Sequence, residues 1–316
     1  MTQLPKYDEL PVVDGAPPGS SWGLWGADDV LGCLNLLTPE TAKRAATLIR
    51  KGAVFPLDWE LQLPDPPLFN RDALVHRVLE KAGEYTDDVI DGYNTQSSSQ
   101  WDGFRHVTLD GQLYNGRSPE EHGVDHWARK GIVGRAVLAD VAAHRAAQGR
   151  PLRLTESEDI GADELQQVFA SQGTTVEPGD ILLVHIGWHD WYRGLEPRIR
   201  AKLATLRAPR CPGLRAGREM VAYLWDQHFA AVASDTPTFE VSPYSAGLSE
   251  DEAQSSYATL HHNLIPKLGI PIGEIWDLSA LARDCAADGV YDCFLSSAPV
   301  HVRSGVGSPP NATAVK

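Results

Sequence analysis

The chain has 316 residues, of which 42% are hydrophobic and 22% are charged, and its formal net charge is −14. This acidic balance argues against nucleic acid or an anionic membrane surface as a partner, because both select for surfaces rich in Lys and Arg. No apolar run approaches the roughly 20 residues that cross a bilayer, and the N-terminus lacks the apolar stretch of a secretory signal. We therefore expect a soluble, cytoplasmic protein that acts on a small-molecule substrate.

The cysteines support an intracellular location. The chain contains four of them, without a CxxC pair. In a chain of this length, such a scatter is typical of reduced thiols rather than of a disulfide framework.

The first third of the chain alternates loops with short elements. Residues 1–21 are rich in Pro, Gly and Ser and predict an extended N-terminal arm. Thr38-Pro39 has the pattern of a helix N-cap followed by proline, so we expect a helix that ends before Gly52. Residues 53–63 predict one or two strands interrupted by proline. The irregular, polar stretch 64–93 predicts a long loop excursion.

The remaining elements alternate between apolar runs and helical patterns. Apolar runs predict buried strands at 137–141, 181–188 and 229–235, with further buried segments at 263–275 and 291–300. Helical periodicity predicts helices at 163–173 and 218–229. Because no repeat and no linker divides the chain, we predict a single α/β domain over residues 1–316, with long loops.

Common nucleotide and nucleophile motifs are missing from the sequence: there is no GxGxxG fingerprint, P-loop or GxSxG elbow. The chemistry must then come from amide, carboxylate and imidazole groups. The segment QSSSQWDGFRH places Gln96, Gln100, Asp102 and His106 within eleven residues. A turn between helical and extended backbone would let the first three side chains converge.

Two further places carry such groups. In HHNLIPKLGIPIGE, His262 and Glu274 are twelve residues apart and suit the two ends of a returning loop. The neighbouring His261 makes this choice ambiguous, since only the spacing selects His262. Asp235 ends an apolar strand, a common position for a site residue in α/β proteins.

These motifs resemble the cyclase family that includes bacterial kynurenine formamidases and isatin hydrolases. That family has a segment HxGTHxDxPxH, followed later by a His and a Glu twelve residues apart. Gln96 and Gln100 stand at the first two histidines of the pattern, Asp102 at its bridging aspartate and His106 at its last histidine. WGADDVLGCLNLLTPE, EPGDILLVHIGW, SDTP and GVGSPPNATAVK resemble the family too, so the likeness spans nearly the whole chain.

The resemblance implies a swivelling β/β/α fold, a homodimer or homotetramer and a divalent metal ion. The ligands that it implies here are carboxamides, carboxylates and one imidazole, namely Gln96, Gln100, Asp102, His262 and Glu274. This oxygen-rich set favours Mn²⁺ or Mg²⁺, with Zn²⁺ also possible. Because carboxamides are weak ligands, the sequence leaves open that the site holds no metal.

The implied chemistry is hydrolysis of an amide, cyclic amide or related acyl bond. His106, Asp102 and Glu274 are the expected catalytic groups, with His106 carrying protons. For an aromatic or cyclic substrate, the predicted binding residues are Trp22, Trp25, Trp101, Arg105 and Asp235.

Other interpretations of the same residues remain open. A metal-free enzyme could use Asp102 and His106 for lactone hydrolysis, cyclisation or dehydration, and a non-catalytic binder could retain the pocket alone. Asp102 and His106 could also form a buried structural pair, and Asp235 could simply cap the end of its strand. Packing is an equally plain role for Trp22 and Trp25.

Overall fold

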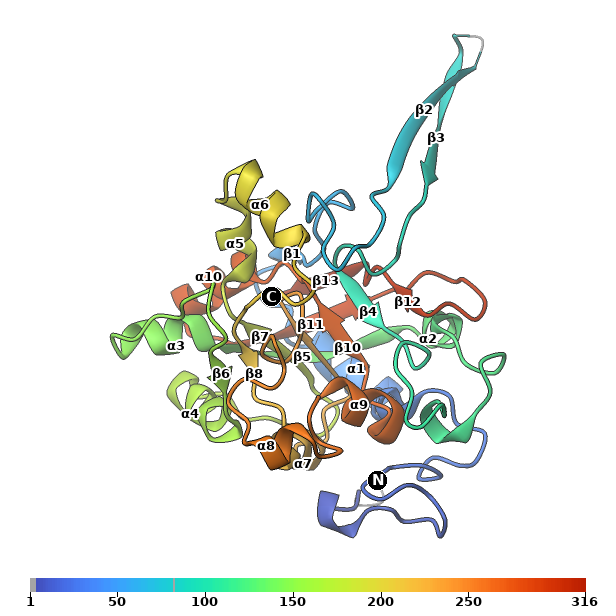
Figure 1. Ribbon diagram of the computed structural model, residues 1–316, viewed down its shortest axis with the longest axis vertical. Helices are drawn as coiled ribbons and strands as arrows, with labels where there is room; N and C mark the ends of the chain where they lie inside the picture. Colours follow the sequence, from blue (N-terminus) through green and yellow to red (C-terminus); the bar gives the residue numbers. More distant parts are fainter. Residues whose placement is uncertain (1–3, 82) are drawn as a thin grey trace.

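The computed structural model describes residues 4–81 and 83–316 and is organised around one mixed sheet (Figure 1). In chain order, the strands of this sheet are β1 (Val54–Pro56), β4 (Gln100–Asp102), β5 (Ile132–Asp140), β7 (Ile181–His185), β9 (Ala231–Ser234), β10 (Ile272–Glu274), β11 (Asp292–Ser297), β12 (Gly307–Ser308) and β13 (Ala312–Val315). They lie in the order β1-β13-β11-β5-β7-β9-β10-β4-β12. Strands β5, β7, β9 and β10 are parallel, and antiparallel strands flank them on both sides.

Helices connect and cover these strands. They are α1 (Pro39–Ala46), α2 (Val124–Lys130), α3 (Val141–Ala147), α4 (Ala162–Gln172), α5 (Trp188–Arg193), α6 (Pro197–Ala204), α7 (Arg218–Asp226), α8 (Glu250–Ala253), α9 (His261–Asn263) and α10 (Ser279–Asp288). Short 3₁₀ turns lie at η1 (Tyr7–Glu9), η2 (Gly32–Leu36) and η3 (Tyr114–Gly116), and η4 (Leu264–Leu268) is a π-helix. Helix α1 packs on β5 and β11, whereas α4 contacts both α3 and α7.

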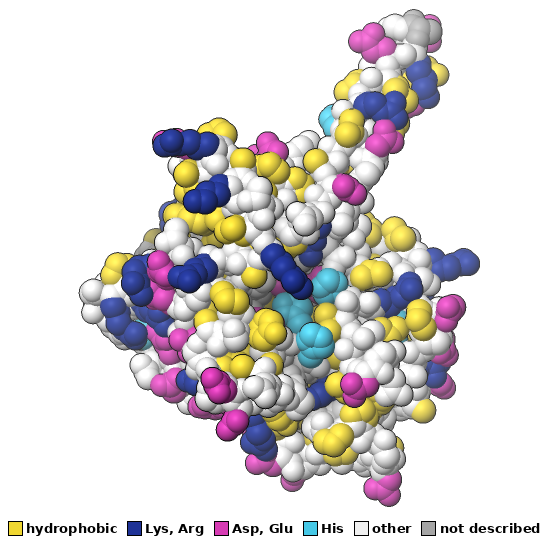
Figure 2. Space-filling model, viewed as in Figure 1, with side chains coloured by type: hydrophobic (Ala, Val, Ile, Leu, Met, Phe, Trp, Pro, Cys, Tyr) yellow, Lys and Arg dark blue, Asp and Glu magenta, His cyan; other side chains and the backbone are white. Residues whose placement is uncertain are grey.

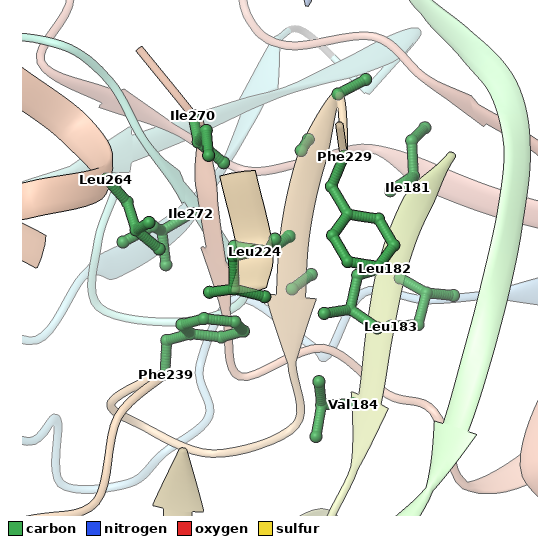
Figure 3. Packing of buried hydrophobic residues seen from close by; sticks show 14 of the residues in the cluster. Ile181, Leu182, Leu183, Val184, Leu224, Phe229, Phe239, Leu264, Ile270 and Ile272 are labelled. Atoms are coloured by element: carbon green, nitrogen blue, oxygen red, sulfur yellow. The ribbon is translucent and has the colours of Figure 1, made fainter. Parts of the chain in front are cut away.

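The core lies against the parallel strands (Figure 3). Residues 181–184 of β7 are fully buried and pack near Leu224 of α7 and Phe229. A parallel strand that is covered on both faces has a continuous apolar sequence, which explains the run ILLV. This hydrophobic cluster includes residues from Tyr7 to Ala314, so both ends of the chain contribute to one core.

Several predicted elements are confirmed. The Thr38 side chain accepts a hydrogen bond from the Thr41 backbone N–H at 3.2 Å and caps α1, although α1 ends at Ala46, earlier than expected. Helix α4 ends at Gly173, whose φ of 64° is the left-handed conformation that favours glycine. Strands β7 and β9 lie within the apolar runs that predicted them.

The excursion predicted across residues 64–93 is present, but it contains two strands that the sequence pattern did not indicate. Strands β2 (Val75–Lys81) and β3 (Tyr85–Asp91) form an antiparallel hairpin that projects from the body (Figure 1). Because both faces of this hairpin meet solvent, Val75, Val78, Tyr85 and Ile90 are exposed. The two strands lack alternating apolar residues, so no period-2 pattern could predict them. The other small sheet pairs β6 (Asp159–Ile160) with β8 (Gly213–Leu214).

The N-terminal segment, as far as residues 4–21 describe it, follows the body near α7. The Tyr7 backbone N–H donates to Asp226 Oδ1 at 2.8 Å, and Trp225 Nε1 donates to the Pro5 carbonyl at 2.9 Å. Residues 1–3 of the expected arm lie outside the described residues. Among the helices that the structure describes, none combines the length and the apolar character of a membrane span. The four cysteines, Cys33, Cys211, Cys285 and Cys293, are free and buried.

Candidate metal centre

The register between β4 and β10 brings two distant carboxylates together. Glu274 pairs with Gln100 across the two strands, and Ile272 pairs with Asp102. Because side chains alternate along a strand, Gln100 and Asp102 point to the same face as Glu274, and Trp101 points to the other. Asp102 is completely buried and Glu274 nearly so, although each would cost several kcal/mol, roughly, if ionised without a partner.

A tight turn after β4 places His106 beside these carboxylates. The Gly103 backbone N–H donates to the Val306 carbonyl at 2.9 Å, and the His106 N–H donates to the Gly103 carbonyl at 2.9 Å. A Cβ on residue 103 would lie 2.5 Å from the Val306 carbonyl oxygen, so this approach requires glycine. The His106 side chain is 28% exposed, so the centre is open to the surface.

The space-filling view shows the same opening (Figure 2). Histidine side chains gather in a hollow near the middle of this face, and a basic side chain lies at its edge. The histidines are surrounded mainly by polar and apolar groups rather than by exposed carboxylates.

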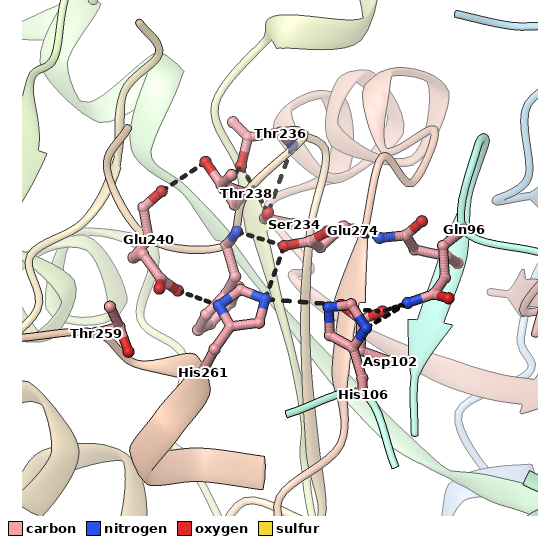
Figure 4. A network of polar contacts seen from close by, with 12 residues as sticks. Gln96, Asp102, His106, Ser234, Thr236, Thr238, Glu240, Thr259, His261 and Glu274 are labelled. Atoms are coloured by element: carbon pink, nitrogen blue, oxygen red, sulfur yellow. Dashed lines mark hydrogen bonds and ion pairs between the residues drawn. The ribbon is translucent and has the colours of Figure 1, made fainter. Parts of the chain in front are cut away.

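Helix α9 contributes a second imidazole, that of His261 (Figure 4). His261 Nδ1 lies 2.6 Å from Glu240 Oε2. Its Nε2 lies 3.1 Å from Glu274 Oε1 and 3.6 Å from Asp102 Oδ2. Glu240 therefore fixes the orientation of the ring, and the opposite nitrogen faces two carboxylates.

The placement of His262 in this centre is corrected by the structure. His262 is exposed, and its Nδ1 lies 2.5 Å from Thr259 Oγ1. Successive helical residues point about 100° apart, so only one of two adjacent histidines can face the carboxylates. Helix α9 continues into the π-helix η4, which has more residues per turn than an α-helix, and residue 261 is the one that faces inward.

The two glutamines hold the carboxylates through their amide nitrogens. Gln96 Nε2 donates to Asp102 Oδ1 at 2.8 Å and lies 2.6 Å from His106 Nδ1. Gln100 Nε2 donates to Glu274 Oε2 at 2.6 Å. The predicted role of both side chains as carbonyl ligands is thus replaced by a role as hydrogen-bond donors to the acidic groups.

The serine run before β4 anchors this segment. Ser99 Oγ donates to the Ile275 carbonyl at 2.5 Å and accepts from the Trp59 N–H at 2.8 Å, while Ser98 Oγ donates to the Glu60 carbonyl. The hydroxyls therefore tie the loop that carries the glutamines to the neighbouring backbone.

Burial and neighbouring charges shift the pKa values of Asp102, Glu274 and His261 in different directions. Burial acts to raise the pKa of Asp102, but the charges of His106 and His261 outweigh it and lower that pKa to about 2. Burial, reinforced by the charge of Asp102, raises the pKa of Glu274. For His261, burial favours the neutral ring, but Glu240 and the other carboxylates raise its pKa well above the ordinary range. The centre therefore attracts positive charge.

The chemistry of these donors fits a divalent cation. One buried oxygen, Asp102 Oδ2, has no hydrogen-bond partner among the described residues. Asp102, His106 and His261 each offer one ligand atom, and these atoms lie within 4.8 Å of one another. A carboxylate bound to the far nitrogen of a histidine, as Glu240 is here, is the usual support of a metal-ligating imidazole.

Comparisons with known proteins agree with this geometry. The family model described as "Putative cyclase" matches residues 55–241. A solved structure described as a novel cyclase is 31% identical, covers 94% of this chain and 99% of its own, and superposes with a TM-score of 0.79. The chain belongs to the cyclase family.

More distant structures share the cyclase fold. Isatin hydrolase A from Ralstonia solanacearum is 18% identical, with coverage of 89% of this chain and 97% of its own and a TM-score of 0.58. Isatin hydrolase A from Labrenzia aggregata is 15% identical, with coverage of 88% and 98% and the same TM-score of 0.58. No curated protein matches the chain. The predicted α/β fold of cyclase type is confirmed.

The tryptophans predicted as substrate walls lie elsewhere in this cyclase-family chain. Trp101 is fully buried: its Nε1 donates to Ser297 Oγ at 2.9 Å, and its ring packs edge-on against Trp276. Trp22 is 9% exposed and donates through Nε1 to the Pro266 carbonyl at 2.7 Å, so it packs against η4. Trp101 therefore points to the face of β4 opposite the carboxylates, and Trp22 packs in the core, so both have packing roles.

Trp25 lines a different cavity, of about 860 Å³. The lining of this cavity includes Glu177 and Pro178, which precede β7, whereas Glu274 ends β10. Strands β7 and β10 run parallel, so the cavity lies at the N-terminal ends of the parallel strands and the metal centre at their C-terminal ends. The predicted wall is therefore not part of the centre.

Asp235 and Arg105 have structural partners as well. Asp235 is fully buried and accepts from the backbone N–H groups of residues 186, 187 and 188, each at 2.8 Å. Its described partners therefore lie at the start of α5, after β7, and not at the end of its own strand β9, as the simpler interpretation had it. Arg105 Nη1 donates to the Ser304 carbonyl, beside β12.

Sequence reasoning missed three residues that the cyclase fold brings to the centre. Glu240, His261 and Arg71 come from separate segments, and none belongs to the motif of residues 96–106. Arg71 Nη1 donates to the Gln96 carbonyl and lies 3.4 Å from Gln100 Oε1. The sequence offered a local signal for two of them: the acidic side chain of Glu240 within FEV, and His261 beside His262, which the spacing did not select.

Proposed function

We propose that this cyclase-family chain is a metal-dependent hydrolase that opens an amide, cyclic amide or related acyl bond of a small substrate. The observation that carries the proposal is that ligand atoms of Asp102, His106 and His261 lie within 4.8 Å of one another. His261 Nε2 lies 3.6 Å from Asp102 Oδ2 and 3.1 Å from Glu274 Oε1. The shared fold with the isatin hydrolases supports the reaction class. The finer proposal is an amidohydrolase or arylformamidase-like enzyme that acts on a carbon–nitrogen bond, with an aromatic or cyclic substrate.

Asp102 and His261 would hold the metal ion, with Glu274 as third ligand in place of His106, whose ring we assign to the substrate. Two carboxylates and one imidazole suit Mn²⁺ or Mg²⁺, and Zn²⁺ is also compatible with them. When bound, such an ion polarises a carbonyl group and lowers the pKa of a water molecule. The glutamine amides keep the carboxylates in place through their hydrogen bonds to Asp102 and Glu274.

His106 supplies a hydrogen-bond donor at the centre. Because the Gln96 amide nitrogen lies against Nδ1 of His106, the neutral ring carries its proton on Nε2. That nitrogen lies 3.8 Å from Asp102 Oδ1. We assign the Nε2–H group to the acyl oxygen, which gains negative charge when water attacks. In the overall reaction the oxygen of water bonds to the acyl carbon, and the leaving nitrogen or oxygen takes a proton.

Metal analysis and chelation test this proposal. The purified protein is expected to contain a divalent metal, and EDTA should abolish hydrolysis of at least one member of a panel of isatin, N-formylkynurenine and dihydrocoumarin. Activity should return with Mn²⁺. Hydrolysis that persists after the metal has been removed would overturn the proposal.

A metal-free acid–base enzyme is the second candidate, and one observation favours it. His261 lies between Glu240, Glu274 and Asp102, so a protonated imidazole could balance their charge without a metal. Such an enzyme would use Asp102 and His106 for lactone hydrolysis, cyclisation or dehydration. EDTA-resistant activity that His106→Ala abolishes would identify it.

A non-catalytic binding role and the cellular context stay predictions. Loss of turnover in His106→Ala, with ligand binding retained, would exclude a simple binder. A homodimer or homotetramer, a cytoplasmic location and the absence of nucleic-acid and membrane partners are still expected. Light scattering on the purified protein would test the assembly.

A further inference from the structure

Arg71 brings a positive charge to the edge of the acidic centre. It lies in the loop between β1 and β2, and its side chain is half-buried. Its Nη1 contacts the Gln96 carbonyl and Gln100 Oε1, and Gln100 in turn donates to Glu274. Only one side chain therefore separates the guanidinium from a proposed metal ligand.

The guanidinium of Arg71 makes no direct ion pair among the described residues, although its charge acts to lower the pKa of Glu274. Among residues 4–81 and 83–316, no carboxylate oxygen lies within the 4.0 Å that defines an ion pair with it. Both hydrogen bonds use Nη1, so Nε and Nη2 have no partner in the same described part of the chain. The guanidinium lies over the Phe69 ring at 5.2 Å, a contact that fixes its plane. A fork of two free N–H groups matches the two oxygens of a carboxylate.

Arg105 was the arginine expected to bind a substrate carboxylate. Its side chain donates to the Ser304 carbonyl beside β12, and no hydrogen bond joins it to the glutamines of the centre. Arg71 instead contacts both of them. The position relative to the reacting groups therefore favours Arg71.

We propose that Arg71 binds a carboxylate group of the substrate, adjacent to the acyl bond that is hydrolysed. This inference rests on the proposed hydrolase function and narrows its substrates to anionic acyl compounds. The aromatic ring of Phe69 lies against the guanidinium, while Nη1 holds it beside the glutamines of the centre. Arg71 is then a specificity residue, because it contacts a part of the substrate that does not react.

Titration calorimetry with benzoate and with its neutral isostere benzamide tests the proposal. The titrations use the full chain, both loaded with Mn²⁺ and after EDTA treatment. Arg71→Gln is expected to weaken benzoate binding about tenfold or more and to leave benzamide binding unchanged. The benzoate affinity of Arg71→Lys should lie between those of the wild type and Arg71→Gln, since lysine keeps the charge but lacks the two parallel N–H groups. Arg77→Gln on the β2–β3 hairpin is the matched control and should behave as the wild type.

The outcomes separate this inference from the proposed function. Equal benzoate affinity in the wild type and in Arg71→Gln overturns the inference, as does equal loss of benzoate and benzamide, which would indicate a structural role. Failure of the wild type to bind benzoate at millimolar concentration also overturns it. Metal dependence of activity, measured separately, decides the hydrolase proposal. Arg71-dependent binding in the EDTA-treated protein would support the inference even if that proposal failed.

Discussion

The centre around Asp102 and the β2–β3 hairpin both place charged side chains on strands, but in opposite surroundings. In the hairpin, Arg77–Asp91 and His76–Asp88 are cross-strand pairs exposed to solvent. At the centre, Asp102 and Glu274 are buried, and each accepts a hydrogen bond from a glutamine amide. Solvent screens the first set, whereas burial makes the second set depend on every partner. Substitutions should therefore have large effects at the centre and small effects on the hairpin.

The largest expected effect is on turnover. Asp102→Asn keeps the shape of the side chain but removes its charge, so the loss of a metal ligand should lower kcat about a thousandfold or more. The matched change Asp88→Asn removes an equivalent charge from the exposed hairpin and should leave kcat unchanged. Steady-state kinetics on the same substrate compares the two. Similar losses in both variants would contradict the assignment of Asp102.

The next effect concerns the support of His261. Glu240→Gln leaves the ring without its carboxylate partner and should weaken metal affinity about 10- to 100-fold. Glu80→Gln on the hairpin is the control. Competition with a fluorescent chelator measures both affinities, and an unchanged value in Glu240→Gln would show that Glu240 does not support a ligand.

The free energy of unfolding should respond very differently to the loss of Trp101 and of Tyr85. Trp101→Ala removes a fully buried ring and should lower the free energy of unfolding by about 3–5 kcal/mol. Tyr85→Ala on the hairpin, where the side chain is 59% exposed, should change it by less than about 0.5 kcal/mol. Denaturant titrations measure both. A small loss for Trp101→Ala would contradict its packing role.

The smallest effect is on pH dependence, and it compares two histidine–aspartate pairs. Burial acts to lower the pKa of His185, but its hydrogen bond to Asp140 and the charge of Asp235 raise it above the ordinary 6.5. A raised pKa stabilises the fold below pH 6.5, and this contribution is lost as the pH rises through the folded-state value. Asp190 adds to the same shift.

His185→Gln should therefore lower the free energy of unfolding more at about pH 6, where the wild-type histidine is charged, than at about pH 9, where it is neutral. His76→Gln, in the exposed pair with Asp88, is the matched control and should cost little stability, because solvent screens this pair. Urea titrations across this range measure the difference. A cost for His185→Gln that does not change with pH would show that the pair is not charged in the folded protein.

The sequence predicted the parts of the molecule that local patterns encode. Features that depend only on neighbouring residues could be predicted. They are the apolar run of β7, the helix cap at Thr38 and the motif with Asp102 and His106. Glu274 was placed by its spacing within a resembling motif. The amide orientation of the glutamines could not be predicted, since it depends on hydrogen-bond partners that only the fold supplies.

What the sequence missed depends on long-range geometry. Helix α9 turns His261, and not the adjacent His262, toward the carboxylates, and residue type alone could not show which of the two does so. Glu240 and Arg71 reach the centre through sheet topology and a loop. The hairpin was missed for a different reason: a ribbon with solvent on both faces has no apolar period to detect.

Metal binding by the two adjacent histidine variants tests the central claim most directly. Equilibrium dialysis with Mn²⁺ should show stoichiometric binding to the wild type and to His262→Ala. His261→Ala should lose this binding while it keeps its folded near-UV spectrum. Equal Mn²⁺ binding by His261→Ala and the wild type, or no binding by the wild type, would contradict the account.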